Sequence, residues 1–160
     1  MNKKRQPSRS SRLRPSNLKL RAWRALMTAH GHITPRLDEE LRAQSDLDLK
    51  SYDTLLHTYE AGAAGIRMAD LAERVVLSKS GLTTLVDRLE DRGLVRRLPD
   101  PADRRATRIV ITDAGIEVFR AAAEVHLDGI ARHFADRITN AEAKTLIDVL
   151  ERVQEPNKDD

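Results

Sequence analysis

Cysteine is absent from this sequence, and aromatic residues make up only 3% of its 160 residues. Without cysteine the chain forms no disulfide, offers no thiolate to a zinc ion and carries no thiol-based redox sensor. Since aromatic rings are so few, the 40% of hydrophobic residues must build a mostly aliphatic core. The length is that of one ordinary domain.

Long apolar runs are missing too. No stretch approaches the roughly 18 apolar residues that a transmembrane helix needs, and the N-terminus has no apolar signal segment, so we expect a soluble protein of the cytoplasm. A glycine-rich phosphate loop, an HExxH sequence, a serine-centred elbow and a cysteine nucleophile are also absent. We therefore expect neither an enzyme nor a cofactor.

Acidic residues are lacking from residues 1–37, which carry ten lysines and arginines. The whole chain has 28 basic and 25 acidic residues, so the remaining residues hold 18 basic against 25 acidic ones. Residues 1–17 contain prolines and serines without an apolar period, which predicts a disordered basic arm. Such an arm suits a polyanionic partner, but it is equally compatible with a solvated tail.

Amphipathic helices are predicted at both ends of the ordered chain. Apolar residues recur every three or four positions over residues 18–47, where Pro35 predicts a kink or a boundary. Over residues 113–155 the last helix opens with a capping box, Thr139 and Glu142. These apolar stripes have no obvious partner within so small a chain, so we expect two copies to pair through them as a homodimer.

Residues 48–112 have a different organisation. Asp48 and Ser78 are expected to cap helices, and Gly93 is expected to end the second of them in a left-handed conformation. Two short β-type runs follow, LVRRL and RIVIT, separated by the polar loop of residues 99–107. Helix, tight turn, helix and two-stranded ribbon in this order predict a winged helix-turn-helix domain, and a mainly α protein with a small β-hairpin (α+β).

The second helix of the pair opens with small polar residues, including Gly81, which allow its first turns to enter a major groove about 12 Å wide. The loop of the ribbon carries adjacent arginines, Arg104 and Arg105, and a narrow minor groove favours arginine. Asp103 lies beside them, and we expect it to stiffen the loop by accepting hydrogen bonds. An arginine pair in a loop is by itself usually only solvated, so the interpretation depends on the whole arrangement.

LSKSGLTTLVDRLEDRGLVRR (residues 77–97) and PDPADRRATRIVITDAG (residues 99–115) resemble the MarR family of bacterial transcriptional regulators. The second stretch is similar to that family's wing signature, and weaker similarity extends over residues 18–153. The resemblance implies a homodimeric, ligand-responsive repressor of a palindromic operator, with double-stranded DNA as its partner. The DNA-binding residues that it implies are Ser78, Lys79, Ser80, Gly81, Thr83, Thr84, Arg88, Asp103, Arg104 and Arg105.

Members of that family commonly release DNA when a small phenolic or carboxylate ligand binds between the dimer helices and the winged domain. Side chains suited to an aromatic or carboxylate effector here are Trp23, Met27, His30, Tyr52, His57 and Arg132. The alternative is that they are core and interface residues. No metal is expected, because histidines 30 and 32 point to different faces of a helix. An architectural DNA-binding protein without a ligand is the competing functional hypothesis.

Overall fold

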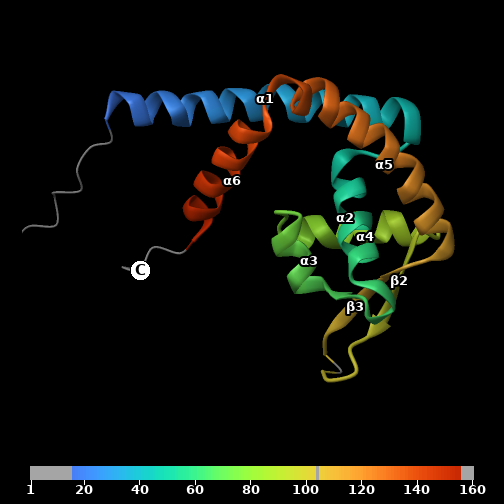
Figure 1. The fold of residues 1–160 in the computed structure, drawn as a ribbon. Helices are drawn as coiled ribbons and strands as arrows, with labels where there is room; N and C mark the ends of the chain where they lie inside the picture. The colour runs from blue at the N-terminus through green and yellow to red at the C-terminus, as the bar shows by residue number, and fades with distance from the viewer. Residues whose placement is uncertain (1–15, 104, 156–160) are drawn as a thin grey trace, which may run out of the picture. The chain divides into compact units, whose positions relative to one another are not determined.

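The computed structural model describes residues 16–103 and 105–155 (Figure 1). Contacts within the chain divide it into two units, residues 1–32 and residues 33–160. The elements run in the order α1 (Asn17–Ser45), α2 (Leu49–Glu60), η1 (Gly62–Ala64), β1 (Ile66–Arg67), α3 (Met68–Arg74), α4 (Lys79–Asp91), β2 (Val95–Pro99), β3 (Thr107–Ile111), α5 (Asp113–His133), η2 (Ala135–Arg137) and α6 (Asn140–Gln154).

The helix starts follow from their capping residues, because a side-chain oxygen there accepts one of the first unpaired N–H groups of the helix. Asp48 accepts from the N–H of residue 51, Ser78 from that of residue 81 and Thr112 from that of residue 115. Thr139 and Glu142 form a complete capping box at the start of α6. Gly93 follows α4 with a φ of 72°. The predicted caps are therefore confirmed.

Of the kink or boundary predicted near Pro35, a helix boundary is wrong, because α1 continues through the proline as an α-helix to Ser45. Proline leaves the carbonyl four residues earlier without its backbone donor. That carbonyl belongs to Gly31, and both residues are exposed, so water can bind it. Beyond the proline, Leu37 and Leu41 are buried and hold the helix to the core.

The sheet has three antiparallel strands in the order β1–β3–β2. In the hairpin, Val95 pairs with Ile111 at the base and Pro99 with Thr107 toward the loop. The sequence analysis predicts the hairpin, but not the pairing of β1 with β3, which joins Ile66 to Ile109. This third strand attaches the hairpin directly to the chain that enters α3.

The core is aliphatic, as the composition predicts. Leucines of α1 to α4 pack with the inner side of the hairpin, and its most deeply buried large side chains include Leu41, Leu55, Leu71, Leu82, Leu89 and Ile109. Aromatic side chains join α2 to α5, where the Tyr52 and Phe119 rings lie 5.6 Å apart. The helix-turn-helix and the hairpin therefore share one core with the start of α5.

Large apolar side chains remain exposed on two helices. In α6 no described residue is buried, and Leu146, Ile147 and Val153 are all exposed. On the first half of α1, Leu18 and Trp23 are also exposed. These are the apolar stripes that the sequence assigns to contact with a second copy.

Candidate nucleic-acid interface

Helix α4 is amphipathic, and its outer face is polar. Leu82, Leu85, Val86 and Leu89 are buried, while Lys79, Ser80, Thr83 and Thr84 are exposed. The Thr83 hydroxyl donates to the Lys79 carbonyl (2.9 Å), and the Thr84 hydroxyl donates to the Ser80 carbonyl (3.2 Å). These bonds use each hydroxyl proton and leave oxygen lone pairs and methyl groups for a ligand.

Gly81 lies in the first turn of α4, beneath the capping hydroxyl of Ser78. A Cβ at this position would lie 3.2 Å from that hydroxyl oxygen, which is tighter than ordinary van der Waals contact. The missing side chain keeps the surface of this turn low, which suits a helix end that approaches another molecule closely.

The turn between α3 and α4 contains Val76 with a φ of 51°. A β-branched residue rarely adopts this left-handed conformation, because its side chain crowds the backbone. The Val76 side chain is 81% exposed. The neighbouring Val75 is buried, and its carbonyl accepts a hydrogen bond from Lys50 Nζ (2.9 Å). Burial on one side and this bond fix the strained turn.

The centre of the hairpin loop is Asp100, a residue that the sequence analysis did not single out. Its side chain is fully buried, and Oδ2 accepts from Arg67 Nε and from Arg108 Nε, each at 2.7 Å. Oδ1 accepts the backbone N–H groups of Ala102 (2.8 Å) and Asp103 (3.0 Å). The hydrogen bonds from Arg67, followed by those from Arg108 and the backbone, hold the pKa of Asp100 well below its usual range.

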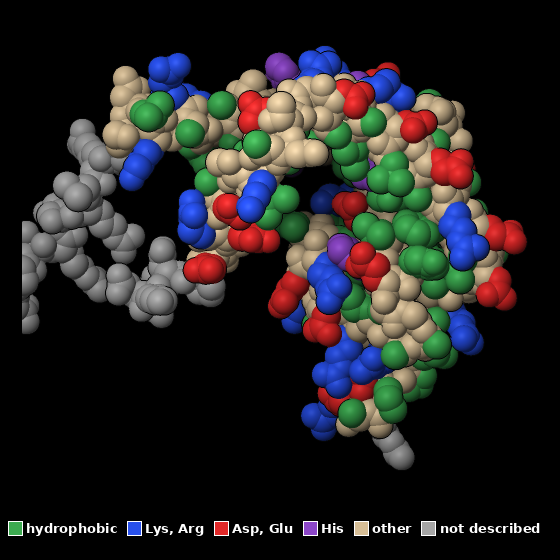
Figure 2. Space-filling view, in the orientation of Figure 1, with side chains coloured by type: hydrophobic (Ala, Val, Ile, Leu, Met, Phe, Trp, Pro, Cys, Tyr) green, Lys and Arg blue, Asp and Glu red, His purple; other side chains and the backbone are tan. Residues whose placement is uncertain are grey.

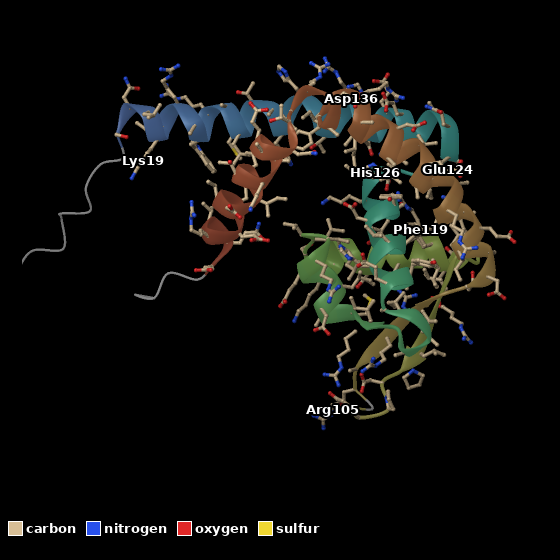
Figure 3. All side chains as sticks on the ribbon, viewed as in Figure 1. Lys19, Arg105, Phe119, Glu124, His126 and Asp136 are labelled. Carbon is tan, nitrogen blue, oxygen red and sulfur yellow. The ribbon has the colours of Figure 1, made fainter. Side chains whose placement is uncertain are left out.

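Asp103 stabilises the loop tip, as predicted. Its carboxylate Oδ1 accepts the backbone N–H of Arg105 (2.9 Å), and its carbonyl accepts the N–H of Ala106 (2.9 Å). The Arg105 side chain is exposed at this tip (Figure 3). Arg104, the other predicted tip arginine, lies outside the described residues.

A groove of about 470 Å³ separates the hairpin loop from the helix-turn-helix. Its lining comes from the start of α3, from the outer face of α4 and from the loop, and includes Arg67, Asp70, Lys79, Thr83 and Arg105. Figure 2 shows lysine and arginine side chains gathered beside the hairpin loop. The structure thus brings Lys79 and Thr83 of the predicted α4 set to the same groove as Asp103 and Arg105 of the loop.

Arg88 is the member of the predicted set that points elsewhere. Its Nη2 donates to Asp48 Oδ2 (3.0 Å) and to Ser51 Oγ (3.3 Å), both at the start of α2. Arg97, on β2, binds Asp87 and Glu90 of α4. These two arginines are engaged in ion pairs within the protein.

The predicted effector residues fall into separate environments. Trp23, Met27 and His30 are exposed on α1. Tyr52 is buried in α2, and half-buried His57 pairs with Glu60 at 3.2 Å. The last member, Arg132, binds Glu40 of α1 at 2.9 Å. It is therefore already paired, and is not a free counter-charge for a carboxylate ligand.

His126 of α5 lies beside Tyr52, with ring centroids 4.4 Å apart (Figure 3). Its Nδ1 is buried and has no hydrogen-bond partner in the described part of the chain. Burial lowers the pKa of His126, and burial raises the pKa of the nearby Asp53. The interface of α2 and α5 thus contains an unsatisfied polar atom within an aromatic setting.

Over residues 16–103 and 105–155, no three histidine, aspartate or glutamate side chains come together as metal ligands would. No helix in that part of the chain is long and apolar enough to span a membrane.

Comparison with known proteins gives one consistent result. The sequence model described as MarR family matches residues 45–106. The chain is 30% identical over 128 residues to the HTH-type transcriptional repressor IacR of Pseudomonas putida, covering 80% of this chain and 74% of that protein.

Solved structures agree over almost the whole chain. Sco3205 of Streptomyces coelicolor, a MarR family regulator in complex with DNA, matches with a TM-score of 0.82 and 28% identity, covering 90% of each chain. CouR of Rhodococcus jostii, bound to p-coumaroyl-CoA, matches with a TM-score of 0.76 and 27% identity, covering 89% of this chain and 98% of its own. The chain belongs to the MarR family of DNA-binding transcriptional regulators.

Proposed function

We propose that the protein represses transcription by binding a two-fold symmetric operator as a homodimer. Helix α4 enters the major groove, and Arg105 at the hairpin tip enters the adjacent minor groove. The observation that carries this proposal is that the polar face of α4 and the hairpin loop line the same groove. The proposed organisation remains residues 48–112 for DNA and residues 18–47 and 113–155 for dimerisation.

Two kinds of contact follow from this placement. The outer face of α4, with Thr83 and Thr84, reads base edges, because a helix fits the major groove, where base pairs differ in their donors and acceptors. Arg105 and Lys79 bind mainly through charge, which attracts DNA of any sequence. Because its target is the chromosome, the proposed site of action is the cytoplasm, and this account needs no catalysis.

The experiment begins with selection of genomic fragments by the wild-type protein, followed by affinity measurements at two salt concentrations. Thr83→Ala should lose about 1–3 kcal/mol at particular base pairs and little elsewhere. Thr83→Val, which keeps the methyl group and replaces the hydroxyl with a second methyl, tests whether the hydroxyl or the methyl is read. Arg105→Ala should weaken binding to all the DNA fragments. Equal wild-type affinity for selected and random DNA would instead indicate an architectural protein.

Dimerisation is proposed through the apolar faces of α6 and of the first half of α1. Their exposed leucine, isoleucine and tryptophan side chains are typical of an interface and costly to leave in water. Deletion of residues 139–160 should yield a monomer or an aggregate in sedimentation. An intact dimer after that deletion would place the interface elsewhere.

The signal is proposed to be a small aromatic or carboxylate compound whose binding releases DNA. Supporting this, CouR has been solved with an aromatic thioester bound, and here His126 Nδ1 offers an unsatisfied hydrogen-bonding atom beside Tyr52. A panel of benzoates and cinnamates, followed by thermal shift and DNA release, tests it. His126→Phe keeps a ring but removes both nitrogens. It should abolish DNA release by any compound that binds beside His126.

A further inference from the structure

Helix α4 is held by ion pairs on both flanks of its second half. On one flank, Arg97 of β2 binds Asp87 and Glu90. On the other flank, Arg88 binds Asp48, which belongs to the segment between α1 and α2. Packing of the leucines and Val86 on the buried face fixes the depth of α4 in the core. Hydrogen bonds are directional, so those of the ion pairs fix the rotation of α4 about its own axis.

Asp48 has a central position in the second flank. Its Oδ1 accepts the N–H of Ser51 as the cap of α2, and its Oδ2 faces Arg88 Nη2 (3.0 Å) and Arg42 Nη2 (3.6 Å). Arg42 lies in the last turns of α1 and also binds Asp38 at 2.8 Å. Asp38 in turn accepts the N–H of Leu49, the first residue of α2 (2.8 Å). One chain of contacts therefore runs from α1 through the cap of α2 to α4.

Arg88 is far from the end of α4 that lines the groove. It lies nine positions after Lys79, which corresponds to about 14 Å along a helix. Although burial opposes the effect, the bonds from Ser51 and Arg88 lower the pKa of Asp48, so the carboxylate is charged at neutral pH. The pair is half-exposed but is held at one end by a helix cap, which limits the freedom of its acidic partner.

We propose that Arg88 is a positioning residue, which acts through Asp48 and Arg42 to set the orientation of α4 relative to α1, and does not itself bind the operator. This inference rests on the proposed function, because it assumes that α4 reads the operator. Asp38 and Arg42 lie in the second half of α1, so these contacts anchor the recognition helix to that part of α1. An incorrectly oriented helix loses base contacts but keeps its charge-based attraction to any DNA.

Asp48→Asn is the sharpest test. Asparagine caps a helix as well as aspartate does, so α2 keeps its cap while the charge facing Arg88 is removed. Operator affinity should fall about tenfold, with affinity for random DNA unchanged. Simple electrostatics gives the opposite sign, because loss of a negative charge should tighten binding to DNA.

Asp46→Asn is the matched control. It removes the same charge two residues away, its side chain is 98% exposed, and it lies 3.5 Å from Arg92. Its φ of 54° is a conformation that asparagine tolerates, so the fold should be unaffected. This variant should bind the operator as tightly as the wild type or slightly more tightly. A tenfold loss in both variants would mean that loop charge, not the contact with Arg88, is responsible, and would overturn the proposal.

Arg88→Gln separates positioning from direct contact. A lost phosphate contact would flatten the dependence of log K on log salt by about 0.9 per contact. A positioning role lowers operator affinity with the slope unchanged, and the double variant with Asp48→Asn should lose no more than Arg88→Gln alone. A flattened slope would overturn the proposal, as would wild-type affinity in Asp48→Asn. If the wild type itself prefers no fragment, the proposed function fails and this inference fails with it.

Discussion

Asp100 and Asp103 show how two acids contribute to a surface that is expected to bind a polyanion. Neither carboxylate is free in the described structure: Asp100 is buried against two arginines, and Asp103 accepts a backbone N–H in the loop tip. The two arginines balance the charge of Asp100, and the hydrogen bond of Asp103 helps to shape the loop. The exposed positive charge of Arg105 is left for the ligand.

Asp100 makes stability depend on pH in a definite direction. Its pKa is lowered in the folded protein, so its contribution is fully present above the ordinary aspartate pKa, about 4, and is lost as the pH falls below that value. Asp100→Asn should therefore be less stable than the wild type at pH 7, with the difference shrinking in acid. Urea unfolding at pH 7 and at about pH 3 measures this. Asp128→Asn, on the exposed side of α5, is the control.

Asp103→Ala should weaken operator binding although it removes an acid from the groove. Without its carboxylate, the N–H of Arg105 loses its partner and the tip becomes less ordered. Asp70 lines the same groove from α3, so Asp70→Asn is matched in charge and should tighten binding. Affinities at two salt concentrations decide the matter: tighter binding by both variants would show that Asp103 acts only as a surface charge.

At the scale of elements, the turn between α3 and α4 stores strain. Val76→Asn should raise the free energy of unfolding by about 1 kcal/mol, because asparagine tolerates the left-handed region and little buried surface is lost. Val76→Ala removes the β-branch but lacks the polar side chain that hydrogen-bonds locally in the left-handed region, so it should gain less. Chemical denaturation at constant m-value compares the two. If neither variant were more stable than the wild type, the turn would carry no strain specific to valine.

Local signals explain why most elements are predictable from the sequence. A cap such as Ser78 and a terminator such as Gly93 act on residues within one turn, and apolar spacing reports the buried face of α4. No helix boundary forms at Pro35, because buried leucines beyond it anchor α1 and their packing outweighs one lost hydrogen bond. Propensity describes the segment alone, whereas packing belongs to the fold.

Ion pairs between residues that are distant in the sequence are the contacts that the sequence does not predict. Arg67 binds Asp100 across 33 residues, and Arg88 binds Asp48 across 40, so no spacing rule identifies them. Arg88 was therefore grouped with the DNA-binding residues although it pairs inside the protein. A local signal could have suggested Asp100. It is an acid at the start of a loop, where its side chain can accept the backbone N–H two positions later, that of Ala102.

At the scale of the whole molecule, charge is concentrated near one end of the sequence. Residues 1–15 lie outside the described residues, so the role of the arm remains a prediction. Removing residues 1–16 takes away six positive charges per chain, and the dependence of log K on log salt should flatten. Replacing those six residues with glutamine, which keeps the length, should have the same effect. An unchanged salt slope would show that the arm does not touch DNA.

The exposed apolar face of α6 has a consequence for the amount of regulator in a cell. A helix of 15 residues with none of them buried is marginal in water on its own. In the proposed dimer the second copy supplies the missing contacts, so ordering of this helix follows mass action. A newly made chain that finds no partner would offer its last 20 or so residues to proteases. Degradation would then remove unpaired copies first, and the regulator would accumulate only above a threshold rate of synthesis.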